Sequence, residues 1–228
     1  MTSSSGSDWA GWCTRFDALK DEVLGLHHSR RVWRAVRAMI ETNPGVQRSG
    51  IAEHWLTQCY SVAQLSGVRR QVDKRKDVVS LWRLLDQLAR QPAMATRSWF
   101  IAELQSRPES ARYVTRLAAE FDAFAGAGNP VTDRSVAEAD RDRLWNVAQS
   151  AKHVVDQFVA HQTDATARPG YTGPALITWG ELDTAIDTLG ELYRKYYKLR
   201  HPGNTVGNLE PDLPAGWDRI FETAWKNG

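Results

Sequence analysis

The histidine with the most informative spacing is His161. It continues the apolar face of a predicted helix, three residues after Phe158, at the point where the chain leaves that helix. An imidazole in such a place is half-buried and can act as a general acid or base near neutral pH. The alternative is a histidine at a helix end that bonds to a backbone carbonyl. Polar side chains on the neighbouring faces of the helix supply a partner in either case, namely Lys152 and Asp156, which lie one turn apart, and His153 and Gln157, which do the same.

The densest local charge lies in residues 69–77, which read Arg-Arg-Gln-Val-Asp-Lys-Arg-Lys-Asp. Cations outnumber carboxylates in this segment, so it is the chain's best candidate for contact with phosphate groups. The alternative is a solvated helix end in which Arg69 pairs with Asp73, four residues later.

The motifs of the commonest catalytic and cofactor sites are absent. The chain has no GxxxxGK[ST], no GxGxxG after a strand, no HExxH and no GxSxG, so the sequence predicts neither a cofactor nor a metal site. His27 and His28 are adjacent, point about 100° apart on a helix and are poorly placed to share a metal ion. We expect them at a helix end, where the dipole favours them. Cys13 and Cys59 form no CxxC and are expected to be buried thiols.

The composition indicates a globular protein of balanced charge. Of 228 residues, 42% are apolar, which is enough for a sizeable core. Lys and Arg number 29 against 27 Asp and Glu, so any basic surface must be local. The N-terminal MTSSSGSD lacks the basic and apolar parts of a signal peptide, and no run of about 18 apolar residues is present. We therefore expect a cytoplasmic protein that is not embedded in a membrane.

Ten tryptophans are spread over the chain. The simpler interpretation is that they are large core residues whose indole N–H groups bond nearby. A platform on which nucleic-acid bases stack is the alternative, and nothing in their spacing favours it.

Apolar residues that recur at steps of three and four predict an all-α chain. The predicted helices cover residues 8–27, 30–41, 51–71, 80–89, 96–105, 108–124, 135–161, 178–196 and 217–225. The first two are expected to pack as an antiparallel pair, with Ser29 as the cap between them. Capping-box spacing starts two later helices at Ser135 and at Thr178. No segment alternates apolar and polar residues, so no sheet is expected.

These helices predict a single domain. Residues 1–7 are expected to be a disordered tail, and residues 8–228 one all-α domain with N-terminal helices over 8–125 and C-terminal helices over 131–225. In the helix over 51–71, the residues Trp55, Cys59, Val62 and Leu65 share one apolar face, which we expect to be buried.

Three stretches resemble the AbiU2-like branch of the HEPN proteins. The first is residues 54–85, with His-Trp-Leu at its start, Val-Arg-Arg-Gln-Val-Asp in its middle and Val-Ser-Leu-Trp-Arg-Leu-Leu at its end. The second is Val-Val-Asp-Gln-Phe-Val-Ala-His at 154–161, and the third runs from Trp217 to Trp225. Together they cover much of residues 50–225. The resemblance implies a HEPN-like helical bundle with additional N-terminal helices.

HEPN proteins are often dimers, and many are metal-independent ribonucleases in toxin, phage-defence (abortive-infection) and RNA-processing systems. Their signature is an arginine followed, after four to six residues, by a histidine. The histidine transfers protons at the ribose 2′-hydroxyl, and the arginine stabilises the phosphate charge. The resemblance places this histidine at His161, but Asp156, Val155 and Val154 stand where the arginine belongs. Because a carboxylate repels the charge that a guanidinium stabilises, the resemblance implies the fold more strongly than the activity.

Two hypotheses follow. The first is an RNA-directed protein, either a ribonuclease with a rearranged site or an RNA-binding module. It predicts a homodimer that brings the catalytic His161 near the RNA-binding residues Arg69, Arg70 or Lys152. The second is a non-catalytic helical protein that acts as the regulatory partner of another protein, which the balanced charge and the missing arginine suit. Nothing in the sequence points to DNA specificity or to a membrane partner.

Overall fold

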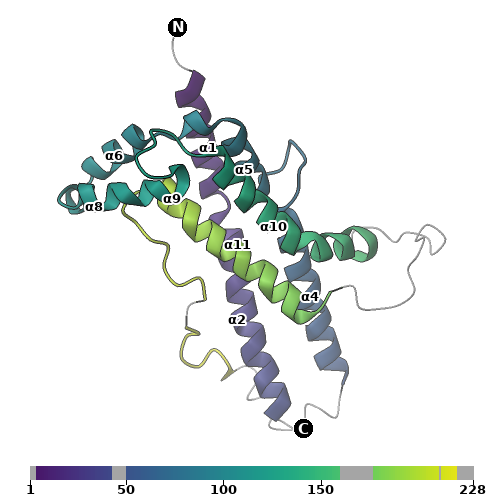
Figure 1. The fold of residues 1–228 in the computed structure, drawn as a ribbon. Coiled ribbons are helices and arrows are strands. Elements are labelled where there is room, and N and C mark those ends of the chain that lie inside the picture. Colours follow the sequence, from purple (N-terminus) through teal and green to yellow (C-terminus); the bar gives the residue numbers. More distant parts are fainter. Residues whose placement is uncertain (1–3, 43–49, 160–176, 211, 220–228) are drawn as a thin grey trace.

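The computed structural model describes residues 4–42, 50–159, 177–210 and 212–219. Within these ranges the chain is all-α, as predicted (Figure 1). The described residues contain no β-strand, only an isolated β-bridge between Thr96 and Val131. The α-helices are α1 (Ser4–Asp17), α2 (Lys20–Thr42), α4 (Ile51–Gln71), α5 (Leu81–Arg90), α6 (Arg97–Gln105), α7 (Pro108–Ala111), α8 (Val114–Ala118), α9 (Asp122–Ala125), α10 (Arg134–Val154) and α11 (Trp179–Arg200). Two short 3-10 turns, Pro92–Met94 and Ala119–Phe121, and a π-helix, Val155–Val159, complete the described elements. No helix among them combines the length and the apolar character needed to cross a bilayer.

Helix α10 lies at the centre of the bundle. It packs against α5, α11 and α4, and α11 also contacts α2 and α4 (Figure 1). The main core fills the space between these helices, and a smaller apolar cluster around Val36 and Ile40 lies toward the C-terminal end of α2. The central position of α10 matters for function because its C-terminal end meets the last turns of α4.

An aromatic stack ties α1 to α11. The ring of Trp12 lies parallel to those of Trp9 and Phe16, and Phe16 in turn stacks on Tyr193 at 5.0 Å between centroids. The indole N–H of Trp12 donates to the carbonyl of Leu84 at 3.0 Å. Trp9 and Trp12 are therefore core residues, whereas Trp55 and Trp179 are 61% and 41% exposed and do not follow the simpler interpretation.

The first helix boundary was predicted wrongly. The chain breaks at Ala18 and Leu19, and α2 then runs without interruption through Ser29. Ser29 therefore lies inside α2 and caps no helix, and the next residue, the buried Arg30, pairs with Asp187 of α11. Helices α1 and α2 follow each other in similar directions rather than forming an antiparallel pair (Figure 1). His27 and His28 thus lie within a helix, and His27 is buried.

The apolar face of α4, predicted to be buried, is mostly exposed. Trp55, Cys59 and Val62 are exposed, and only Leu65 of the predicted apolar face is buried. Cys13 is a buried thiol, as expected, but Cys59 is not. Helix α4 packs against α10, α11 and α2. In its first turns Ile51 and Trp55 are exposed, whereas Leu56 packs against the apolar cluster of α2. Periodicity identifies an apolar face but not the helix that will cover it.

Helix caps were predicted with mixed success. Ser80 and Thr178 each accept a hydrogen bond from a backbone N–H in the first turn of the next helix. Thr96 caps α6 in the same way, although the sequence did not lead us to expect it. Ser135 does not, because Asp133 caps α10 two residues earlier. The helix predicted over 108–124 is divided into α7, α8, α9 and a 3-10 turn.

Candidate nucleic-acid interface

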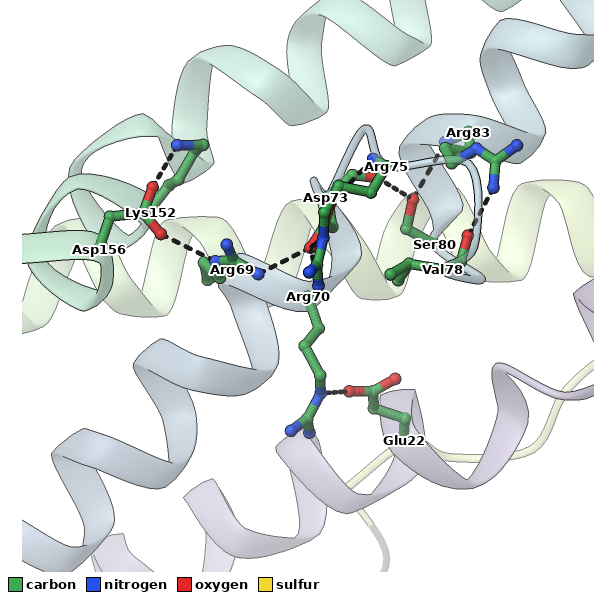
Figure 2. Close-up of polar contacts among 10 residues, drawn as sticks. All are labelled: Glu22, Arg69, Arg70, Asp73, Arg75, Val78, Ser80, Arg83, Lys152 and Asp156. Atoms are coloured by element: carbon green, nitrogen blue, oxygen red, sulfur yellow. Dashed lines mark hydrogen bonds and ion pairs between the residues drawn. The ribbon is translucent and has the colours of Figure 1, made fainter. Parts of the chain in front are cut away.

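The basic segment begins in the last turn of α4 and continues in the turn that leads to α5. Arg69 and Arg70 lie in that last turn, where the helix dipole favours cations. The end of α10 and the π-helix pack against α4, which brings Lys152 and Asp156 beside Arg69 (Figure 2). Two parts of the chain that are distant in sequence, the end of α4 and the end of α10 with its π-helix, therefore meet at this site.

Asp156 joins two of the three predicted RNA-binding residues. Its carboxylate accepts from the Nε of Arg69 at 2.9 Å and forms an ion pair with Lys152 (Figure 2). Burial opposes ionisation of Asp156, but the hydrogen bonds from Lys152 and Arg69 outweigh it and hold the pKa of the carboxyl below its usual range. The residue that stands in place of the expected arginine thus binds an arginine from another helix.

Arg70, the third predicted residue, points away from this group. Its guanidinium pairs with Glu22 of α2 (Figure 2). Gln71 donates to the same carboxylate at 2.8 Å. The side chain of Arg70 is 56% exposed. Arg70 therefore links α4 to α2 and is not brought together with Arg69 and Lys152.

Asp73 fixes the turn between α4 and α5. Its buried carboxylate accepts from Arg69 at 2.7 Å, which confirms the predicted pairing, and from the backbone N–H of Arg75 at 2.9 Å. Burial opposes ionisation of Asp73, yet the hydrogen bonds from Arg75 and the charge of Arg69 lower its pKa. Ser80 donates to the carbonyl of Asp73 at 2.7 Å, and Arg83 donates to that of Val78 at 2.8 Å (Figure 2). The turn is held from both ends.

This anchored turn presents exposed cations. Lys74, Arg75 and Lys76 are all exposed, and the side chain of Arg75 keeps 65% of its surface accessible although it pairs with Asp73. Groups held in place in this way lose little conformational entropy when they bind a charged ligand. We call Arg69, Lys74, Arg75, Lys76 and Lys152 the basic surface.

Two aromatic side chains border the basic surface. The ammonium of Lys74 lies 3.4 Å from the ring centroid of Trp145 and 4.7 Å from that of Trp82. Both rings are half-buried, and their centroids are 6.5 Å apart in an edge-to-face arrangement. Aromatic faces beside cations suit contact with single-stranded nucleic acid, where bases stack and phosphates pair.

The π-helix Val155–Val159 directly follows α10. Such elements are rare and are frequently found at functional sites, because the extra residue in the turn redirects the side chains after it. Here it carries Asp156 toward Arg69. His161, the predicted catalytic residue, lies two residues further on and outside the described residues.

Sequence reasoning missed the contacts that organise the site. It placed Asp156 one turn from Lys152 but gave no sign that Arg69 would join them, since 87 residues separate Arg69 from Asp156. Trp82 and Trp145 carry no signal of their own, because apolar spacing marks them as ordinary helix residues. Within the described residues no group of three His, Cys, Asp or Glu side chains is arranged to hold a metal ion.

Comparison with known proteins adds no relative to this description. No family model, no curated protein and no solved structure matches the chain.

Proposed function

We propose that this chain is an RNA-directed protein of the HEPN, AbiU2-like kind that acts in phage defence or toxin-type regulation, and that its basic surface binds single-stranded RNA. The observation that carries the proposal is the anchored turn with Lys74, Arg75 and Lys76 exposed beside Trp82 and Trp145. The turn supplies cations for phosphates, and the accessible parts of the rings that Lys74 does not cover supply surface for bases. Cytoplasmic RNA is the partner that fits both.

The geometry favours an RNA-binding module over a ribonuclease. Arg69 and Lys152 share the carboxylate of Asp156, so a phosphate that approaches them meets an anion already in place. A catalytic guanidinium has to face the phosphate without such competition. The ribonuclease form of the proposal rests on His161 and on a second copy of the chain that supplies a free cation.

Salt-dependent RNA binding tests the proposal. We expect the double variant Arg75→Ala, Lys76→Ala to bind a single-stranded oligoribonucleotide several-fold more weakly, as measured by fluorescence anisotropy. The slope of log affinity against log salt should fall by about 1 to 1.5, because two phosphate contacts are lost. The matched control is Arg37→Ala, Arg134→Ala, which removes two exposed arginines from other helices. No RNA retention at low salt, or equal losses in both double variants, would rule out this surface.

Cleavage is tested separately. Purified protein is incubated with total RNA in the presence of a chelator, and cleavage that disappears in His161→Ala supports the ribonuclease form. Retention of RNA without cleavage would support the RNA-binding module instead. We expect this outcome, because Arg69 and Lys152 both pair with Asp156.

The second candidate is the helical interaction protein, and the exposed face of α4 favours it. Ile51, Trp55 and Val62 are 81%, 61% and 40% exposed on one side of that helix. Apolar patches of this kind often mark protein interfaces. If this reading holds, the protein purified from its native host emerges in a complex that Trp55→Ser dissolves while RNA binding is unchanged. Emergence of the wild-type chain alone would contradict it.

A further inference from the structure

A polar cavity of about 260 Å³ lies between α1, the end of the turn before α5, and α5 itself. Arginines contribute much of its wall. Its lining residues include Arg15 from α1, Arg83 and Arg90 from α5, the cap residue Ser80, and the amide side chains of Gln87 and Gln91. It is separate from the basic surface, since none of the five residues that define that surface lines it.

Two of the arginines bring charge that no carboxylate offsets. Arg15 donates to the side-chain oxygen of Gln87 at 2.7 Å, and Arg83 donates to the carbonyls of Val78 and Lys76. In the described part of the chain neither guanidinium has an acidic partner. Their neutral acceptors hold the groups in place and leave their full charge available.

The acidic residues of the wall are partly neutralised. Asp86 pairs with Arg90 at 2.6 Å and also with Arg141 at 3.0 Å, so two cations share one carboxylate. Asp8 is the second carboxylate at the cavity. Three arginines of the wall therefore stand against two acids, and the N-terminal end of α5 at Ser80 adds the positive end of a helix dipole. The cavity has the electrostatics of an anion site.

We propose that this cavity binds a phosphomonoester. A phosphomonoester carries about two negative charges near neutral pH and so matches the two uncompensated guanidiniums, whereas a carboxylate or a phosphodiester carries one. Guanidiniums bind phosphate oxygens in pairs of parallel hydrogen bonds. Gln87 and Gln91 offer amide groups to the sugar or base that the phosphate bears.

A free nucleotide and the phosphorylated end of an RNA both supply this group. The inference does not depend on the proposed function, because the cavity and the basic surface use different residues. Variants of the basic surface that lose RNA binding should still bind phosphate in the cavity. Variants of the cavity that lose phosphate binding should still bind RNA at the basic surface.

Isothermal titration calorimetry at low ionic strength tests the inference with inorganic phosphate, dimethyl phosphate, a nucleoside 5′-monophosphate and its nucleoside. We expect saturable binding of phosphate and of the monophosphate, and at least about tenfold weaker binding of the singly charged dimethyl phosphate and of the nucleoside. Oligoribonucleotides with a 5′-phosphate or a 5′-hydroxyl then distinguish the two sources. Preference for the phosphorylated end identifies RNA, and equal binding identifies the free nucleotide.

Arg15→Gln is the decisive variant, because it removes a charge from the wall. It should weaken phosphate binding about tenfold or more, and Arg15→Lys should recover part of the loss. The matched control, Arg37→Gln, lies on α2, which contributes nothing to the wall, and should bind as the wild type does. Circular dichroism verifies that each variant is folded. Absence of saturable phosphate binding by the wild type, or equal weakening in Arg15→Gln and Arg37→Gln, would overturn the proposal.

Discussion

Asp156 decides how much charge the basic surface can offer a ligand. It neutralises part of the charge of Arg69 and Lys152, which would otherwise face solvent together. A single carboxylate can therefore tune the affinity of the surface for phosphates without contacting RNA.

We expect Asp156→Asn to bind single-stranded RNA about three- to tenfold more tightly than the wild type, because Lys152 is released, Arg69 keeps only Asp73 as a partner and one repulsive charge is removed. Fluorescence anisotropy at two salt concentrations measures the change. Glu138→Gln is the matched control, since it removes one carboxylate from α10, the helix that precedes Asp156, and frees only Arg134. An equal gain in both variants would mean that net charge alone matters.

We predict that the buried His27 makes the folded protein less stable in mild acid. Burial and the charge of Arg30 lower the pKa of its ring to about 4, from about 6.5 in an unfolded chain. Between these values the unfolded state binds a proton that the folded state refuses, so stability falls as the pH drops from about 6.5 to 4, by up to about 3 kcal/mol. His201, whose pKa is lowered by burial and by Arg200, adds to the loss in the same direction.

Urea denaturation at a series of pH values checks this prediction. His27→Gln should flatten the decline over that range, and His28→Gln, which changes the exposed neighbouring histidine, should not. A decline of equal size in both variants would contradict the assignment. Asp73 and Asp156 act at lower pH, because their lowered pKa values contribute stability above about pH 4 that is lost as the pH falls further.

The element that positions the basic surface is the turn between α4 and α5. Ser80 serves it twice, as the cap that accepts from the N–H of Arg83 and as the donor to the carbonyl of Asp73. Loss of this hydroxyl releases the turn from α5 and leaves a buried carbonyl without its donor.

Ser80→Ala should reduce the free energy of unfolding by about 1 to 2 kcal/mol and also weaken RNA binding. Thr96→Ala removes the corresponding cap of α6 and should cost a similar amount of stability with RNA binding unchanged. Chemical denaturation and anisotropy on the two variants separate the effects. Weaker RNA binding in both would show that the anchoring of the turn is irrelevant.

At the scale of the whole molecule, the stack of Trp9, Trp12, Phe16 and Tyr193 joins the N-terminal helix to the rest of the bundle. It makes α1 part of the main core. The wall of the arginine cavity depends on this junction, because α1 supplies Arg15.

Trp12→Ala should destabilise the protein by about 3 to 5 kcal/mol, because it empties a fully buried site and leaves the carbonyl of Leu84 without its donor. Trp55→Ala should change stability far less, since that side chain is 61% exposed. Thermal and urea unfolding of the two tryptophan variants measures the difference. Similar losses in both would mean that exposure does not distinguish them.

The sequence by itself determined the all-α class, most helix spans and the caps at Ser80 and Thr178. These depend on neighbours within about four residues, which periodicity and capping chemistry report directly. The pairing of Arg69 with Asp73 was predictable for the same reason.

Only the tertiary structure decided which faces and charges find partners. It left Trp55 and Cys59 on the surface, buried His27, and joined Arg69 to Asp156 across 87 residues. The physical reason is that burial and ion pairing depend on which helix packs against which, and a helical repeat is the same whether its apolar face meets a neighbour or solvent.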